Sequence, residues 1–136
     1  MKTAILIMLL LFQGHDGRGE SPDELCDSPR TPDIVECIQR QLREAEQTQL
    51  AYLAEIRRRL EDHESDLAAL EDAQRAWTDF VSADCRAVYE RWKDGTIRGP
   101  MFVGCKLEHT VRRTHDLWER YLRGIVTELP EPFRPR

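Results

Sequence analysis

The stretch LAALEDAQRAWTDFVSADCRAVYERW, residues 67–92, decides the fold class of this chain. Apart from one glutamine, the residues on one face of it are apolar and recur at intervals of three or four, or their sum, as on an α-helix. They are Leu67, Leu70, Gln74, Trp77, Val81, Cys85, Val88 and Trp92. The stretch contains no glycine or proline that would interrupt a helix. It therefore predicts an amphipathic helix, which has to bury its apolar face against another element.

A second amphipathic helix is expected before this stretch. Thr31-Pro32-Asp33 has the features of a helix start: a capping hydroxyl, proline at the first helical position, and an acid that the helix dipole favours. No glycine or proline follows until Gly95. The apolar residues again recur at helical spacing, at Ile34, Ile38, Leu42, Ala45, Tyr52, Ile56 and Leu60.

The polar segment EDHES, residues 61–65, separates the two apolar series and offers Asp62 and Ser65 as caps. The apolar phase barely slips across it, so two arrangements remain open. One is a helical hairpin that turns near residue 63, and the other is a continuous helix about 90 Å long. We favour the hairpin, because a lone apolar stripe has to be covered by another element.

A third helix is expected after a loop. The segment DGTIRGP, residues 94–100, indicates the loop by its two glycines and one proline. The helix should run from about Met101 to Gly124, with Cys105, Val111, Trp118, Tyr121, Leu122 and Ile125 as its apolar members. The predicted fold class is therefore all-α, a small three-helix bundle.

The two ends of the chain differ from the helical part. The N-terminus, MKTAILIMLLLF, has one lysine and an apolar run that is shorter than the roughly 20 residues of a membrane-spanning helix. We interpret residues 1–19 as a signal peptide, with an uncleaved tether as the alternative, and expect an exported protein, periplasmic or secreted. Residues 20–127 form the predicted domain. The Pro-rich tail, residues 128–136, is expected to be disordered.

Export changes how the four cysteines, Cys26, Cys37, Cys85 and Cys105, are interpreted. An even number of cysteines in a short exported chain indicates disulfides, and the chain has no C-x-x-C pair of the kind that zinc sites use. Folding the hairpin brings all four to one end, which leaves three connectivities open. We favour local pairing, Cys26 with Cys37 and Cys85 with Cys105, so that two disulfides staple the bundle.

Several classes of function lack their residues. The net charge of −5 disfavours nucleic acid and anionic membranes as partners, and we expect no stable membrane insertion of the mature chain. His109 and His115 are six residues apart, whereas a helical metal pair needs a spacing of four, so we expect ordinary surface histidines and no metal site. Ser82 has no G-x-S-x-G frame, and no glycine loop could cradle a phosphate. We therefore expect neither an enzyme nor a cofactor.

The charged run RRRLEDHESD, residues 57–66, is expected to be a solvated face, with an acidic docking tip as the alternative. Its acids and bases stand four apart in three pairs, which contribute little each: Glu55 with Arg59, Arg57 with Glu61, and Arg58 with Asp62.

The three tryptophans, Trp77, Trp92 and Trp118, occupy apolar helical positions, which predicts packing in the core. A tryptophan at a rim could instead anchor a partner. Gln74 lies three residues before Trp77, near enough to hydrogen-bond an indole or a neighbouring backbone group.

The loop WKDGTIRGPM, residues 92–101, is the best candidate for recognition of a partner, with a simple connector as the alternative. Its two glycines give the backbone freedom, and a disulfide at its base would hold it in place, which reduces the entropy lost on binding. We expect Arg98 to project from it, and we take Lys93 and Arg98 as the candidate contact residues.

Two motifs in the second half of the chain resemble those of the lysozyme-inhibitor LprI-like family of small exported bacterial proteins. The first is Ala73-Gln74-Arg75-Ala76-Trp77 followed by Phe80, Asp84 and Cys85, and the second is Cys105 followed by Thr110, Arg113, Thr114 and Leu117. The resemblance covers roughly residues 26–122. It implies an all-helical, disulfide-bonded protein in which Gln74, Trp77, Phe80, Thr110, Arg113 and Leu117 form a structural motif.

The same resemblance implies a function. Lysozyme inhibition through protein–protein contact is the activity that the family name describes. The alternative is a non-catalytic envelope interaction or stress module that has no lysozyme partner.

Overall fold

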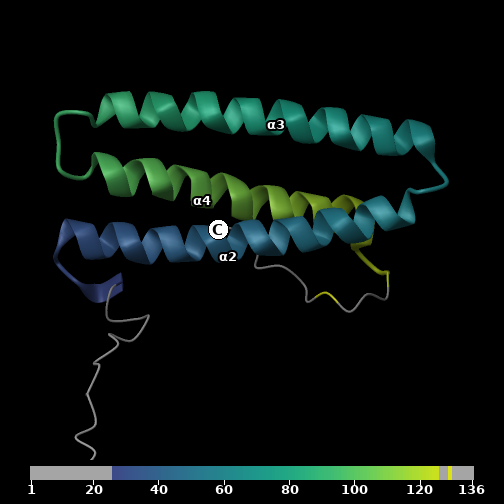
Figure 1. The fold of residues 1–136 in the computed structure, drawn as a ribbon, viewed down its shortest axis with the longest axis horizontal. Coiled ribbons are helices and arrows are strands. Elements are labelled where there is room, and N and C mark those ends of the chain that lie inside the picture. The colour runs from purple at the N-terminus through teal and green to yellow at the C-terminus, as the bar shows by residue number, and fades with distance from the viewer. Residues whose placement is uncertain (1–25, 126–128, 130–136) are drawn as a thin grey trace, which may run out of the picture.

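The computed structural model describes residues 26–125 and Leu129 (Figure 1). Over these residues it contains the α-helices α2 (Thr31–Arg59), α3 (Glu64–Arg91) and α4 (Arg98–Leu117), and a short π-helix, η1 (Trp118–Leu122), which continues α4. No strand occurs in this part of the chain, so the predicted all-α fold is confirmed. The expected signal peptide, residues 1–19, lies outside the described residues, as does the expected tail apart from Leu129.

The chain turns between α2 and α3, which decides for the hairpin and against one continuous helix. The N–H of Leu60 still donates to the carbonyls of Ile56 and Arg57, at 3.0 and 3.2 Å. The N–H of His63 then donates to the carbonyl of Leu60 at 2.8 Å, which closes the turn. The turn falls in the polar segment where the sequence placed it.

The predicted helix caps are wrong. Arg30 precedes α2 and His63 precedes α3, and neither makes a side-chain capping bond. Thr31 cannot be the cap because the carbonyl of Arg30 already accepts the first helical hydrogen bonds, from Asp33 and Ile34 at 3.1 Å. In the same way the carbonyl of His63 accepts from Asp66 and Leu67, so Asp62 lies before the cap and Ser65 after it.

The third helix begins earlier than expected, at Arg98 instead of Met101. The N–H of Met101 donates to the carbonyl of Ile97 at 3.0 Å, so the two residues before Met101, Gly99 and Pro100, already lie in the first turn. Proline is tolerated there because the first N–H groups of a helix have no partner within the helix. The helical segment ends at Leu122, two residues before the expected end at Gly124.

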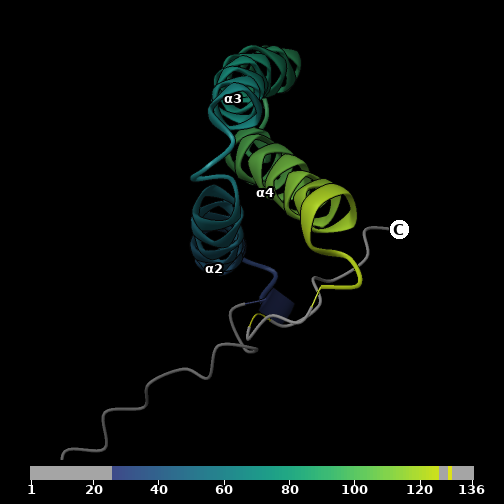
Figure 2. The same cartoon turned by 90° about the vertical axis from the view of Figure 1, so that its right-hand side faces the viewer.

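Helix α4 is the central element of the bundle. It packs extensively against both α2 and α3, and η1 also contacts α2. Figures 1 and 2 show α2 and α3 as the outer helices, with α4 placed between them. The hairpin helices are therefore joined by the turn, but their apolar faces are covered mainly by α4.

The hydrophobic core joins all the helical elements of the described chain. Its fully buried members are Tyr52, Leu53 and Ile56 of α2, Leu70 of α3, Leu117 of α4 and Leu122 of η1. Leu129 packs against this cluster from outside. Two of the expected apolar positions are exposed to solvent: Trp92 is 38% exposed and Ile125 is 40% exposed, because each follows the end of its helix.

Two disulfides bridge cysteines that are near one another in the sequence. Cys26 pairs with Cys37 across a Cα–Cα distance of 5.2 Å, and Cys85 pairs with Cys105 across 5.6 Å. This confirms the local connectivity. The first ties the segment before α2 to that helix, and the second joins α3 to α4. In the described part of the chain, no helix is both long enough and apolar enough to cross a membrane.

Candidate functional site

A polar network connects the three helices through the family-like motif residues. The Nε of Arg113 on α4 donates to Oε1 of Gln74 on α3 at 3.1 Å. The Nε2 of Gln74 donates to Oε1 of Gln49 on α2 at 3.4 Å, and the Nε2 of Gln49 donates to the backbone carbonyl of Thr110 at 3.5 Å. Burial, followed by the nearby Arg120, lowers the pKa of Arg113. Gln74 therefore bonds neither an indole nor backbone but two side chains.

The other motif residues lie on both sides of this network. Leu117 is fully buried in the core, and Trp77 is half-buried, as expected for packing positions. Phe80 is 56% exposed, and its ring meets the ring of His109 edge-on, with 5.3 Å between the ring centroids. The Nε2 of His109 lies 2.8 Å from Oδ2 of Asp84. These contacts join α3 to α4, although Phe80 itself stays largely exposed.

The expectation of ordinary surface histidines is wrong. His109 is only 22% exposed and contacts Asp84 and Phe80. His115 is half-buried, and its Nε2 is buried with no hydrogen-bond partner among the described residues. Both rings lie on α4, and the central position of that helix, which the sequence did not show, explains their burial.

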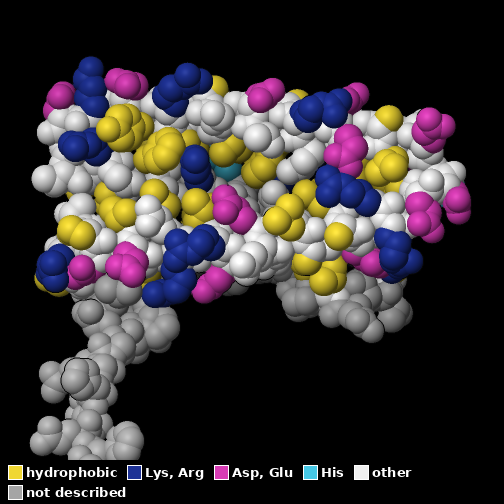
Figure 3. All heavy atoms as spheres, in the orientation of Figure 1, with side chains coloured by type: hydrophobic (Ala, Val, Ile, Leu, Met, Phe, Trp, Pro, Cys, Tyr) yellow, Lys and Arg dark blue, Asp and Glu magenta, His cyan; other side chains and the backbone are white. Residues whose placement is uncertain are grey.

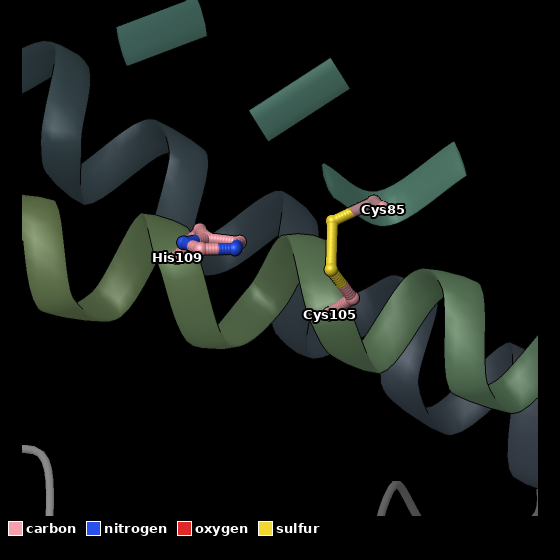
Figure 4. A group of neighbouring side chains, drawn as sticks. All are labelled: Cys85, Cys105 and His109. Atoms are coloured by element: carbon pink, nitrogen blue, oxygen red, sulfur yellow. A yellow bond between two sulfur atoms is a disulfide. The ribbon is translucent and has the colours of Figure 1, made fainter. Parts of the chain in front are cut away.

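His109 also lies next to the Cys85–Cys105 disulfide, four residues after Cys105 on the same helix face (Figure 4). One nitrogen of His109 and the two sulfur atoms lie within 4.8 Å of one another. Cysteine and histidine at this spacing can ligate a metal as thiolate and imidazole. In this structure both sulfur atoms are held in the disulfide, so neither is a thiolate, and the geometry is that of a structural bridge beside a histidine.

The charged run near the hairpin turn forms different ion pairs from most of those expected. Arg59 pairs with Glu55 at 2.7 Å, as predicted, and Arg58 joins the same carboxylate at 2.9 Å. Arg57 reaches across to Glu71 on α3 and makes two hydrogen bonds, at 2.6 and 3.0 Å. This last pair ties α2 to α3 and could not be predicted from spacing within one helix.

The loop between α3 and α4 carries a group of exposed side chains, here called the loop-end surface: Trp92, Lys93, Ile97, Arg98 and Met101. Trp92, Ile97 and Met101 are 38%, 42% and 38% exposed, which is high for large apolar side chains. Trp92 is therefore not a core residue, and it lies under the guanidinium of Arg91 at 5.9 Å.

Arg98 does not project freely from this loop. Its Nη1 donates to the backbone carbonyls of Lys93 at 3.3 Å and Gly95 at 3.4 Å, so the guanidinium closes the loop on itself. The N–H of Arg98 also donates to the carbonyl of Gly95 at 3.4 Å, so both the backbone and the side chain of Arg98 hold the turn. The side chain of Lys93 is 59% exposed, and its ammonium is 3.7 Å from Glu90. Contact of Lys93 and Arg98 with a partner stays a prediction.

Residues 26–117 match the protein family described as Lysozyme inhibitor LprI. The match begins at the first cysteine, includes both disulfides and the polar network, and ends at the buried Leu117. This chain belongs to the LprI family. A search of curated proteins and a search of solved structures each found no match. The loop-end surface lies within residues 26–117, the part of the chain that matches the LprI family.

Sequence reasoning missed Gln49, the contact of Asp84 with His109, and the position of His109 beside the disulfide. Gln49 lies on the buried face of α2, and its phase with Tyr52 and Ile56 was a readable signal. The spacing of four between Cys105 and His109 is a readable signal too, because it places both residues on one face of a helix. The contact of Asp84 with His109 gave no signal, because the two residues lie on different helices.

Proposed function

We propose that the oxidised protein inhibits a lysozyme by direct contact through its loop-end surface, and that this chain performs no catalysis itself. The observation that carries the proposal is the group of exposed apolar and basic side chains at a loop held by the Cys85–Cys105 disulfide, in a chain of the LprI family. Export is part of the proposal, since disulfides persist in oxidising compartments.

The exposure of the apolar residues supports a contact surface. Trp92, Ile97 and Met101 lie at one end of the molecule although the bundle has a core that could bury such side chains. Tryptophan is enriched among the residues that dominate protein–protein binding energies. A partner that covered these side chains would remove their apolar surface from water, which favours association.

The loop is pre-shaped for binding. The N–H of Gly95 donates to the carbonyl of Trp92 at 2.9 Å, and Arg98 closes the loop through two further carbonyls. The disulfide joins the two helices that carry the loop. A loop held in one conformation loses less entropy on binding, so more of its contact energy appears as affinity.

The charges fit a lysozyme as well. Lysozymes are commonly basic, and a net charge of −5 on this chain would favour encounter with a basic protein. Their catalytic groove contains two carboxyl groups. The exposed ammonium of Lys93 could pair with one of them in a charge-assisted hydrogen bond.

The experiment is a cell-wall turbidity assay with c-type, g-type and i-type lysozymes and the purified oxidised protein. Inhibition predicts slower clearing by at least one type. Lys93→Ala and Arg98→Ala should each weaken that inhibition about tenfold, the first by loss of an ion pair and the second by loosening of the loop. Arg43→Ala, an exposed change on α2, is the matched control. Unchanged clearing with all three types would favour the non-catalytic envelope module.

A further inference from the structure

A groove between α3 and α4 shares no lining residue with the loop-end surface or with the polar network. It has a volume of about 400 Å³ and is lined by Ser82, Arg86 and Tyr89 of α3 and by Phe102 and Lys106 of α4. Figure 3 shows apolar and basic side chains close together where α3 meets α4, at the end of the molecule that carries the α3–α4 loop (left in the view). The volume lies within the range of small-molecule sites, roughly 300–1,000 Å³.

Two aromatic rings form an apolar surface in this groove. Tyr89 and Phe102 meet edge to face, with 5.9 Å between ring centroids and 81° between ring planes. The ammonium of Lys106 lies 4.8 Å from the centroid of Phe102 and covers one face of that ring. Tyr89 remains 38% exposed. A ligand with one flat apolar face could therefore rest against Tyr89 while a charged group of the same ligand reached Lys106.

The groove is positively charged in an otherwise acidic chain. Its lining contains two cations and no acid, although the chain has 25 acidic against 20 basic residues. Neither Arg86 nor Lys106 forms an ion pair with a described residue, whereas Arg57, Arg58 and Arg59 all pair with glutamates. Two cations without carboxylate partners, both beside an aromatic surface, favour an anionic ligand.

We propose that this groove binds a saccharide that carries a carboxylate. Both walls are α-helices, whose backbone groups are bonded within the helix, so an extended acidic peptide would find no backbone partners there. A compact ligand recognised by side chains alone fits better. A sugar ring presents an apolar face for Tyr89 and hydroxyls for Ser82, and its carboxylate would be held by Arg86 and Lys106. This ligand site is independent of the proposed lysozyme contact.

The test is an NMR titration of the oxidised, isotope-labelled full chain without lysozyme. N-acetylmuramic acid and N-acetylglucosamine share one ring and differ by an ether-linked carboxylate, and D-lactate supplies the carboxylate without the ring. The groove predicts saturable shifts at Tyr89, Phe102 and Lys106, with N-acetylmuramic acid bound at least about tenfold more tightly than either of the other two. An acidic hexapeptide tests the rival occupant.

Variants separate the groove from general charge. Arg86→Gln and Lys106→Met should each weaken binding of N-acetylmuramic acid about fivefold or more, and Arg43→Gln, which removes the same charge from α2, should not. Circular dichroism confirms that each variant is folded. Equal affinity for the two sugars, tighter binding of the peptide, absence of saturable shifts, or equal effects of Lys106→Met and Arg43→Gln would each overturn the proposal. Lysozyme inhibition has its own assay, so the two ideas fail separately.

Discussion

Gln74 and Arg113 share a 3.1 Å hydrogen bond that fixes α3 against α4, and the same glutamine side chain donates to Gln49 of α2. One residue of the middle of α3 therefore contacts both other helices. The two motifs, which lie far apart in the sequence, therefore meet at this contact between α3 and α4.

Gln74→Ala should lower the free energy of unfolding by about 1–3 kcal/mol, because it leaves the partly buried guanidinium of Arg113 without its acceptor. Urea denaturation followed by circular dichroism measures the change. The neighbouring Arg75→Ala is the control, since the Arg75 side chain is 71% exposed, and its effect should stay within about 0.5 kcal/mol. Equal losses in the two variants would remove Gln74 from this role.

Two glycines of α4 should respond differently to replacement by alanine. A Cβ at Gly104 would meet nothing within 4 Å, so Gly104→Ala should stabilise the protein by about 0.5–1 kcal/mol through helix propensity. A Cβ at Gly99 would lie 3.3 Å from Cγ2 of Val35 on α2, which opposes the same gain. Thermal melting should therefore rank Gly104→Ala above Gly99→Ala. Adding Val35→Ala to Gly99→Ala should reduce the difference in melting temperature between the two glycine variants. An unchanged difference would contradict the close contact between residue 99 and Val35.

Acid should weaken the tie between α2 and α3. The hydrogen bond from Arg57 holds the pKa of Glu71 below its ordinary value of 4.5. A lowered carboxyl pKa contributes stability above 4.5, and this is lost as the pH falls through the folded-state value. The free energy of unfolding of the wild type should exceed that of Glu71→Gln by up to about 1 kcal/mol near neutrality, since the pair is partly exposed to solvent. Melting curves across the acid range should show the difference closing, and a constant difference would contradict the linkage.

The two disulfides should contribute unequally to the free energy of unfolding. Removing the inner bridge with Cys85→Ala and Cys105→Ala should cost about 3 kcal/mol or more, because it frees a long loop and also opens space around the fully buried Cys85. Removing Cys26–Cys37 should cost less, since Cys26 is exposed at the end of the described chain. Chemical denaturation of the two double variants measures which removal lowers the free energy of unfolding more. The reverse order would show that the N-terminal tie contributes more than the helix staple.

The sequence predicted what depends on local pattern. Apolar spacing predicted the helices, the polar segment of residues 61–65 predicted the turn, and nearness in the sequence favoured the observed disulfide pairs. It could not show that α4 lies between the other two helices, because periodicity identifies an apolar face but not its partner. The Arg57–Glu71 pair, the burial of His109 and the cationic groove all follow from that placement. The exposure of Trp92 was equally hidden, since its helical phase matched the core.

The most direct measurement for the central claim is the inhibition constant of Trp92→Ala against the lysozyme type that the turbidity assay identifies. If the loop-end surface makes the contact, the constant should rise about tenfold or more, as expected for a buried anchor. Leu50→Ala removes another side chain, 60% exposed, from α2 and should leave the constant nearly unchanged. Equal constants for wild type and Trp92→Ala would contradict the account.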